Sequence, residues 1–323
     1  MRLRTAFMLA GTCLLALAHS VQAQVYPVRP VKIVVPFATK GAADIISRLL
    51  ADRLSGVMQQ PVVVQNLPGG GGSVATEAVA RTAPDGYTLL YVSGATLVTT
   101  PIFARTPRYD PLTSFAPISL LSSFPSIVAV HPSLPARTLG ELTDLIKAAP
   151  GRYRYATTGS GSHSYFAGEL FKSQTQLDIK DVEAKIPLTA WRVLVNGDAD
   201  IIFEVSVVLA ASVKEGRARA LAVMGHGRLS QFPDVPTTVE LGLPELTAYV
   251  WSGLVAPAGT PPAIIQVLNE ATRSILSEIE TQATFVRYGM QAEGSTPEQF
   301  HRLIRAELTK WSRALPLSAT EGK

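Results

Sequence analysis

The fold of this chain is decided by residues 31–54, which read VKIVVPFATKGAADIISRLLADRL. The β-branched run at residues 31–35 is typical of a buried parallel strand, and Pro36 ends it because proline has no N–H for strand pairing. Asp44 then stands where a helix N-cap is expected, before apolar residues that recur at helical spacing. A strand, a loop and a helix in this order predict an α/β fold.

The same stretch is a simple receptor for anions. The first-turn N–H groups of a helix have no partner inside the helix, and the helix dipole favours negative charge at that end. In open α/β sheets, ligands bind at the carboxyl ends of the strands, where this loop lies. Such a unit also occurs in proteins whose loop binds nothing, so this stretch alone leaves both interpretations open.

Residues 1–23 are predicted to be a signal peptide that is removed on export. Two arginines form its charged start, residues 6–18 its apolar centre, and residues 21–23 a small-residue cleavage site. The apolar run is shorter than the roughly 18 residues that a membrane span needs, which disfavours the alternative of an N-terminal anchor. Cys13, the only cysteine, lies in this segment, so we expect no disulfide and no thiolate metal site in the mature protein.

The composition indicates an ordered protein with little net charge. Hydrophobic residues make up 47% of the chain and charged residues 17%, a balance typical of a well-buried fold. The formal net charge is +4 before the signal peptide is removed, and no block of lysines and arginines is present, so we expect no nucleic-acid partner. About 300 residues remain after cleavage, more than one hydrophobic core usually holds, which predicts two domains.

Two glycine-rich loops follow other predicted strands. Residues 67–73, LPGGGGS, lack the Gly-Lys-Ser/Thr of a P-loop, which leaves close chain packing and a direct ligand contact as alternatives. Residues 157–164, TTGSGSHS, follow a strand at 153–156 and open a helix. Because their backbone and hydroxyl donors can surround a carboxylate, this loop is the second predicted anion receptor.

The chain offers no recognisable catalytic centre. His163 lies between two serines, but sequence neighbours seldom adopt triad geometry, and no Gly-x-Ser-x-Gly elbow is present. The histidines after residue 23 do not have the spacing of metal ligands. Glu204 is a lone acid at the end of a predicted strand. We therefore expect no enzyme, no cofactor and no metal. The alternative, an exported α/β hydrolase, would need an activated nucleophile.

Several motifs stand in a fixed order and cover essentially all of the chain after residue 23. They are VVPFATKGAADIISRLLADRL, NLPGGGGSVATEAVARTAPDGYTLL, YDPLTSFAPISLL, VAVHPSLPARTLGEL, TTGSGSHSYFAGELF, WSGLVAPAGTPPAIIQVLNEA and GSTPEQFHRLIRAEL. In this order they resemble the Bug-type periplasmic solute-binding proteins, which serve tripartite tricarboxylate transporters. The resemblance implies a two-lobed type II periplasmic binding protein, with a mixed sheet flanked by helices in each lobe. It also implies a small carboxylate ligand: a dicarboxylate, an acidic amino acid, or a citrate-like or aromatic acid.

The domain boundaries follow from two predicted crossings between the lobes. Residues 122–125 are expected to lead out of the first lobe and residues 249–255 to return to it. Lobe 1 is therefore predicted to comprise residues 24–124 and 249–323, and lobe 2 residues 125–248. The resemblance implies a monomer that delivers its ligand to membrane subunits of a tripartite tricarboxylate transporter. The alternative partner is a membrane sensor kinase.

Carried over by position, the resemblance places the ligand between loops of both lobes and the ends of two strands. The predicted ligand-binding residues are Phe37, Ala38, Thr39, Lys40, Gly41, Asp44, Thr96, Thr158, Gly159, Ser160, Gly161, Ser162, His163, Ser164 and Glu204.

Three segments depart from the family pattern. Lys40 stands in a loop that is usually a run of small residues, where it either bonds a carboxylate or is merely solvated. Residues 182–186, VEAKI, replace a Val-Pro-Tyr-Lys-Gly loop, and Glu204-Val205 replaces Asp-Asn. We expect the altered wall of lobe 2 to have changed the specificity or weakened the binding.

Overall fold

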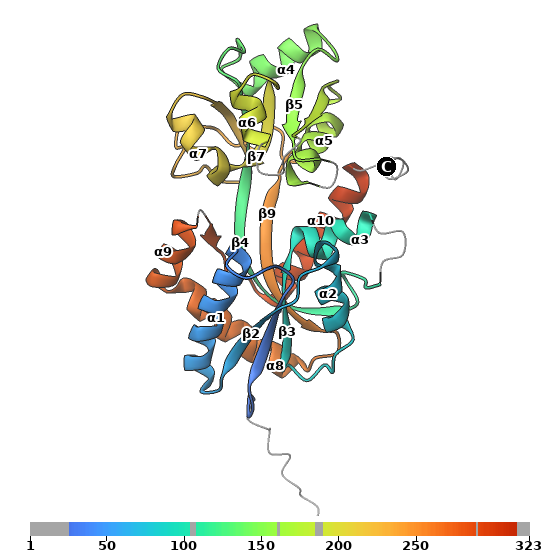
Figure 1. The fold of residues 1–323 in the computed structure, drawn as a ribbon, viewed down its shortest axis with the longest axis vertical. Coiled ribbons are helices and arrows are strands. Elements are labelled where there is room, and N and C mark those ends of the chain that lie inside the picture. The colour runs from blue at the N-terminus through green and yellow to red at the C-terminus, as the bar shows by residue number, and fades with distance from the viewer. Residues whose placement is uncertain (1–25, 104–107, 160–161, 185–189, 289, 315–323) are drawn as a thin grey trace, which may run out of the picture.

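The computed structural model describes residues 26–103, 108–159, 162–184, 190–288 and 290–314. They form two α/β bodies stacked along the long axis of the molecule (Figure 1), which confirms the predicted two-lobed α/β fold. Lobe 1 is the body that contains β1 (Val31–Val35), and lobe 2 is the body that contains β5 (Arg154–Thr157). The predicted signal peptide lies outside the described residues.

Lobe 1 is built on a mixed sheet. Its strands, in spatial order, are β2 (Val62–Asn66), β1, β3 (Thr88–Ser93), β9 (Tyr249–Pro257) and β4 (Phe115–Val130). β1 is parallel to β2 and β3, whereas β9 is antiparallel to both β3 and β4. The short strand β10 (Gln291–Ala292) pairs with β4 in the antiparallel sense.

Successive side chains of β1 point to opposite faces of this sheet, so β1 contributes to the hydrophobic core on each face. Ile33 and its neighbours two residues away pack into one core with α1 (Ala42–Met58), α8 (Pro262–Ser277) and α9 (Ile279–Arg287). Val34 points to the other face and packs with α2 (Ser73–Ala80). The β-branched run therefore forms the buried strand that the sequence predicts, covered on both sides.

β4 passes from one lobe into the other without a break. Its first part pairs with β9 in lobe 1, up to Pro125 opposite Tyr249, and from Ser126 onward it pairs with β7 (Ile201–Val205) and β8 (Arg219–Met224) in lobe 2. The sequence predicts two strands, at 115–121 and 126–130, with a crossing between them. In the structure, residues 122–125 stay extended within one continuous strand, because β9 continues to pair with them.

Lobe 2 repeats the α/β arrangement with a second mixed sheet. β5 lies between β7 and β6 (Lys180–Glu183) and is parallel to both, whereas β7 is antiparallel to β4. α5 (His163–Thr175) packs on one face with Tyr155 and Phe203, and α6 (Ala190–Val195) and α7 (Ser206–Lys214) pack on the other. α4 (Leu139–Ala148) is capped by Thr138, whose side chain accepts a hydrogen bond from the Glu141 N–H, as predicted.

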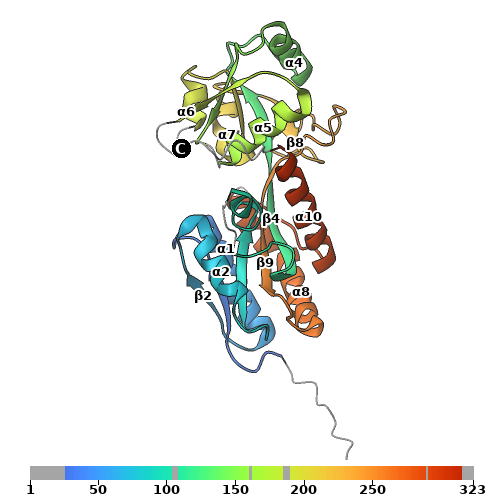
Figure 2. The same ribbon diagram turned by 90° about the vertical axis from the view of Figure 1, so that its right-hand side faces the viewer.

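The last helix, α10 (Pro297–Ala314), connects the two lobes along the side opposite α1 and α2 (Figure 2). Near its start, Phe300 is fully buried in lobe 1, edge-on to Trp251 with ring centroids 5.6 Å apart. Near its end, Trp311 packs on Phe166 of α5, with ring centroids 5.7 Å apart. α10 therefore has its first turns in lobe 1 and its last turns against lobe 2.

Within the described part of the chain, no helix is long and apolar enough to cross a membrane.

We expect Phe300→Ala to lower the free energy of unfolding by about 3–5 kcal/mol, because the buried ring would leave a cavity between α10 and β9. Urea unfolding of the mature protein measures this change. Val267→Ala is the matched control, since Val267 is 40% exposed on α8 and should change the value by less than about 0.5 kcal/mol. A loss below about 1 kcal/mol for Phe300→Ala would contradict the packing of α10 described above.

Candidate ligand-binding cleft

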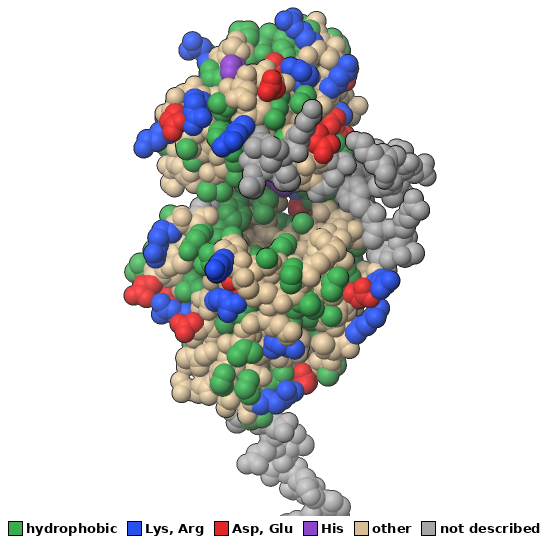
Figure 3. All heavy atoms as spheres, viewed as in Figure 1, with side chains coloured by type: hydrophobic (Ala, Val, Ile, Leu, Met, Phe, Trp, Pro, Cys, Tyr) green, Lys and Arg blue, Asp and Glu red, His purple; other side chains and the backbone are tan. Residues whose placement is uncertain are grey.

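The strand directions place the predicted loops on opposite sides of one cleft. β1 and β3 run in the same direction as β4, whereas β5, β6 and β7 run against it. The carboxyl ends of β1 and β3 in lobe 1 therefore point toward lobe 2, and those of β5, β6 and β7 in lobe 2 point toward lobe 1. The surface is hollowed between the two lobes (Figure 3). Ligands of α/β sheets bind at these carboxyl ends.

In lobe 1, Asp44 organises the loop between β1 and α1. One carboxylate oxygen accepts a hydrogen bond from the Lys40 N–H at 2.9 Å, and the other accepts one from the Asn66 amide at 2.9 Å. Arg48 lies 2.9 Å from the second oxygen. The predicted N-cap role is wrong, because α1 begins at Ala42 and Gly41 is the N-cap residue.

These contacts fix the charge of Asp44. The hydrogen bond from Arg48, followed by those from the Lys40 N–H and Asn66, holds the pKa of the buried carboxyl below its usual value, although burial acts in the other direction. Asp44 therefore stays ionised and holds the loop in place. No side chain caps the first turn of α1, so its N–H groups stay available at the edge of the cleft.

Residues 38–41, which follow Phe37 in this loop, are exposed. Lys40 has a left-handed backbone (φ 68°) that its hydrogen bond to Asp44 supports. Its side chain forms no ion pair with any described residue. Lys40 is thus an unpaired positive charge on the lobe 1 side of the cleft.

Thr96 lies in the helical turn Ala95–Thr99 that follows β3, and it is fully buried. Its hydroxyl accepts a hydrogen bond from the Ser93 N–H at 3.0 Å, and its carbonyl accepts one from Tyr109. Gly72 has φ 93°, and a Cβ at this position would clash with the Thr96 methyl group. Of the two alternatives for the glycine-rich loop, this geometry supports close chain packing.

In lobe 2, hydroxyl groups hold the loop between β5 and α5. The Thr157 hydroxyl accepts a hydrogen bond from the Gly159 N–H at 2.8 Å, and the Ser164 hydroxyl accepts one from the Thr158 N–H at 3.3 Å. Ser162 is the N-cap of α5 and accepts a hydrogen bond from the Tyr165 N–H. Ser160 and Gly161, two of the predicted ligand-binding residues, lie outside the described part of the chain.

His163 joins this loop to the crossing strand. Its Nε2 atom is hydrogen-bonded to the hydroxyl of Ser126, a buried residue of β4. Burial, and then the positive charge of Lys310, lowers the pKa of His163 to about 4. The ring is therefore neutral at pH 7 and ties the start of α5 to β4.

Two glutamates end the strands on either side of β5. Glu204 lies near the end of β7, where burial raises the pKa of its carboxyl and the Val205 N–H donates a hydrogen bond to it at 2.8 Å. Glu183 is the last residue of β6, directly beside Thr157 in register. From the sequence, Glu183 is expected only to form part of an altered wall of lobe 2. The sequence signal that both residues share is a lone acid at the end of a strand.

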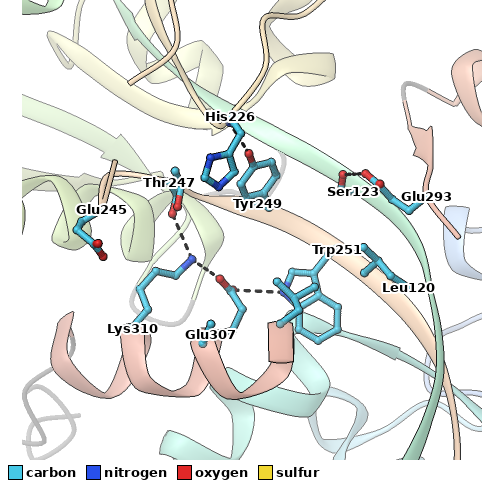
Figure 4. Close-up of a pocket in the computed structure, with 12 residues that line it drawn as sticks. Leu120, Ser123, His226, Glu245, Thr247, Tyr249, Trp251, Glu293, Glu307 and Lys310 are labelled. Carbon is cyan, nitrogen blue, oxygen red and sulfur yellow. Dashed lines mark hydrogen bonds and ion pairs between the residues drawn. The ribbon is translucent and has the colours of Figure 1, made fainter. Parts of the chain in front are cut away.

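A separate pocket lies beside α10, where the two lobes meet (Figure 4). Its volume is about 420 Å³, and its walls include His226 and Tyr249, which stack, and the pair Glu307 and Lys310. Glu307 is buried and accepts hydrogen bonds from the indole N–H groups of Trp251 and Trp311. This network is not predictable from the sequence, because a glutamate and a lysine three residues apart on a helix resemble an ordinary surface pair.

Comparison with known proteins gives consistent matches over nearly the whole chain. Residues 46–316 match the model of the tripartite tricarboxylate transporter family receptor. The chain is 34% identical to Protein BugT of Bordetella pertussis over 297 residues, which is 92% of this chain and 91% of BugT.

Two solved structures with bound acids are also similar. One is Rpa4515 from R. palustris with adipate, 29% identical, with a TM-score of 0.69 over 91% of this chain and 98% of that one. The other is MatC from Rhodopseudomonas palustris with bound malate, also 29% identical, with a TM-score of 0.67 over 90% and 99%. The matched proteins are receptors and periplasmic binding proteins, not enzymes.

We expect Asp44→Asn to destabilise the protein at pH 7 by about 1–3 kcal/mol, because hydrogen bonds to a charged group would be lost. The folded-state pKa of Asp44 is lowered, so its contribution is complete above the unfolded pKa of about 3.9 and is lost as the pH falls through the folded value. Urea unfolding at a series of pH values should therefore give a difference from wild type that shrinks below about pH 4. A difference that grows toward low pH would contradict this assignment.

Proposed function

The chain belongs to the tripartite tricarboxylate transporter receptor family, and we propose that it captures a small carboxylate between its lobes and delivers it to a membrane transporter of that type. The observation that carries the proposal is the pair of opposed loops, each at the N-terminus of a helix and each at the carboxyl end of a parallel strand. Both helix ends favour negative charge and offer N–H donors. The cleft therefore suits a molecule with acidic groups that contacts both lobes.

We assign the direct contacts to the loops and the supporting roles to the buried residues. In lobe 1, the loop from Phe37 to Gly41, exposed from Ala38 onward, meets the ligand, and Asp44 holds this loop in place, while the buried Thr96 holds the end of β3. In lobe 2, we assign the contact with a carboxyl group to the described residues on either side of 160–161, namely Thr158, Gly159, Ser162 and Ser164, and His163 fixes this loop on β4. A ligand that contacts both loops favours the closed arrangement of the lobes, which rotate about the crossing strands.

The related structures support an acid as the ligand, since Rpa4515 holds adipate and MatC holds malate. In this proposal, the chain acts in the periplasm after residues 1–23 are removed, works as a monomer, and hands its ligand to the membrane subunits of the transporter.

A thermal-shift screen tests the carboxylate function. The mature protein is unfolded and refolded to remove any bound ligand, and then mixed with mono-, di- and tricarboxylates, acidic amino acids and aromatic acids. A ligand at about 100 times its dissociation constant stabilises the folded state by about 2.7 kcal/mol, which raises the melting temperature by several degrees. No shift with any acid, from protein that is demonstrably folded, would overturn the proposal.

Lys40→Ala should weaken binding of the acid found in that screen by about tenfold, because a charge-assisted hydrogen bond to a carboxylate would be lost. Isothermal titration calorimetry measures the affinity. Lys147→Ala is the matched control, since Lys147 is exposed on α4 and should leave the affinity unchanged. Equal affinities of Lys40→Ala and wild type would show that the lysine is merely solvated.

A further inference from the structure

A second cavity, the pocket beside α10, lies apart from the cleft. Its volume of about 420 Å³ is within the range of about 300–1,000 Å³ that is usual for small-molecule pockets. None of the described residues in the loops at 37–41 and 158–164 lines it. α10, which forms one of its walls, lies on the side of the molecule opposite α1, the helix that follows the lobe 1 loop (Figure 2). An occupant of this pocket would therefore not be the ligand of the cleft.

Both lobes and the crossing strands contribute side chains to this pocket. Thr247 belongs to the lobe 2 segment that leads into β9, and Leu303 and Ala306 belong to α10. Leu120 lines the pocket from β4. The three aliphatic side chains give the pocket an apolar surface, on which the hydrocarbon part of a small molecule can pack.

Tyr249 and His226 form an aromatic wall of the pocket (Figure 4). Their rings stack with centroids 6.3 Å apart, and the backbone N–H of His226 donates a hydrogen bond to the Tyr249 hydroxyl at 2.7 Å. Burial raises the pKa of Tyr249, so the phenol keeps its proton at pH 7. A neutral aromatic ring presents a negative face, which attracts cations.

The charged groups of the pocket also favour a cation. The described residues that line it carry three carboxylates, on Glu245, Glu293 and Glu307, against one ammonium group, on Lys310. Glu307 and Lys310 form an ion pair with each other, and Lys310 also donates to the Thr247 carbonyl. The other two glutamates are exposed and lie at opposite ends of the pocket (Figure 4). The pocket therefore presents negative charge at both ends of an apolar and aromatic middle.

We propose that this pocket binds an elongated organic cation, a diamine or polyamine with a positive group near each end. One ammonium group pairs with Glu245, the other pairs with Glu293, and the hydrocarbon chain between them packs on the aliphatic side chains and on Tyr249. An acid would meet like charge at both ends, so the pocket discriminates against the ligands of the cleft. The proposal does not rest on the carboxylate function and holds whether or not an acid binds between the loops.

Linear molecules of the same length but different charge test this proposal. Diaminoalkanes with four to eight carbon atoms are compared with the amino alcohols and the diols of equal length, by isothermal titration calorimetry on the mature protein. At the length that fits the pocket, we expect the diamine to bind at least tenfold more tightly than the diol, with the amino alcohol between them. Equal binding of diamine and diol at every length, or no binding of any diamine, would overturn the proposal.

Variants of the two exposed glutamates locate the bound diamine. Glu245→Gln and Glu293→Gln keep the size of the side chain and remove its charge, and each should weaken binding of the diamine by about threefold. The double variant should weaken it by about tenfold and bind the diamine no more tightly than the diol.

Asp144→Asn is the matched control, because Asp144 is an exposed acid on α4, outside the pocket, and should leave the affinity for the diamine unchanged. Thermal melting checks that each variant is folded. An unchanged affinity in the folded double variant would overturn the proposal, because the diamine would then bind elsewhere on the protein.

Discussion

The antiparallel pairing of β4 with β9 in lobe 1 and with β7 in lobe 2 sets the geometry of the whole molecule. β4 has 16 residues, well beyond the usual length of a strand, and it belongs to both sheets. Because it runs with β1 and β3 but against β5 and β7, it turns the carboxyl edges of the two sheets toward each other. The register with β9 shifts twice before the crossing, at 117–119 and 120–122. Such irregularities bend a strand, and they make this part of β4 a natural place for the lobes to pivot.

A buried hydrogen-bond network around Glu307 of α10 also restrains how the lobes can move about this part of β4. Glu307 receives hydrogen bonds from two indole N–H groups and from Lys310, which also donates to the Thr247 carbonyl in the segment leading into β9. A buried carboxylate that is satisfied in this way holds its neighbours in one arrangement, whereas loss of a donor would leave a costly charge. The charge of Lys310 also acts on His163, at the start of α5. The helix that presents the lobe 2 loop is thus positioned by β4 and by α10 together.

The sequence predicts the parts of this structure that depend on local signals. The β-branched run at 31–35, the helix that follows the Gly/Ser-rich loop and the cap at Thr138 each carry their own pattern, and each forms the predicted element. The unbroken path of β4 is not predictable in this way, because Pro125 resembles a strand end and only pairing with β9 keeps it extended. The actual role of Asp44 depends on Asn66, which lies 22 residues away in the chain. The Glu307 network likewise depends on Trp251, 56 residues away.

The internal hydrogen bonds of the two loops determine what a ligand must do. Asp44 already holds the lobe 1 loop, and the hydroxyls of Thr157, Ser162 and Ser164 already hold the lobe 2 loop, so little ordering remains to be done on binding. The remaining change is the approach of the lobes, and a ligand favours it only through contacts that are stronger in the closed arrangement. A molecule that reaches one loop alone makes the same contacts in either arrangement and cannot drive closure. In the proposed function, recognition therefore selects for a ligand long enough to reach both loops and with an acidic group at each end.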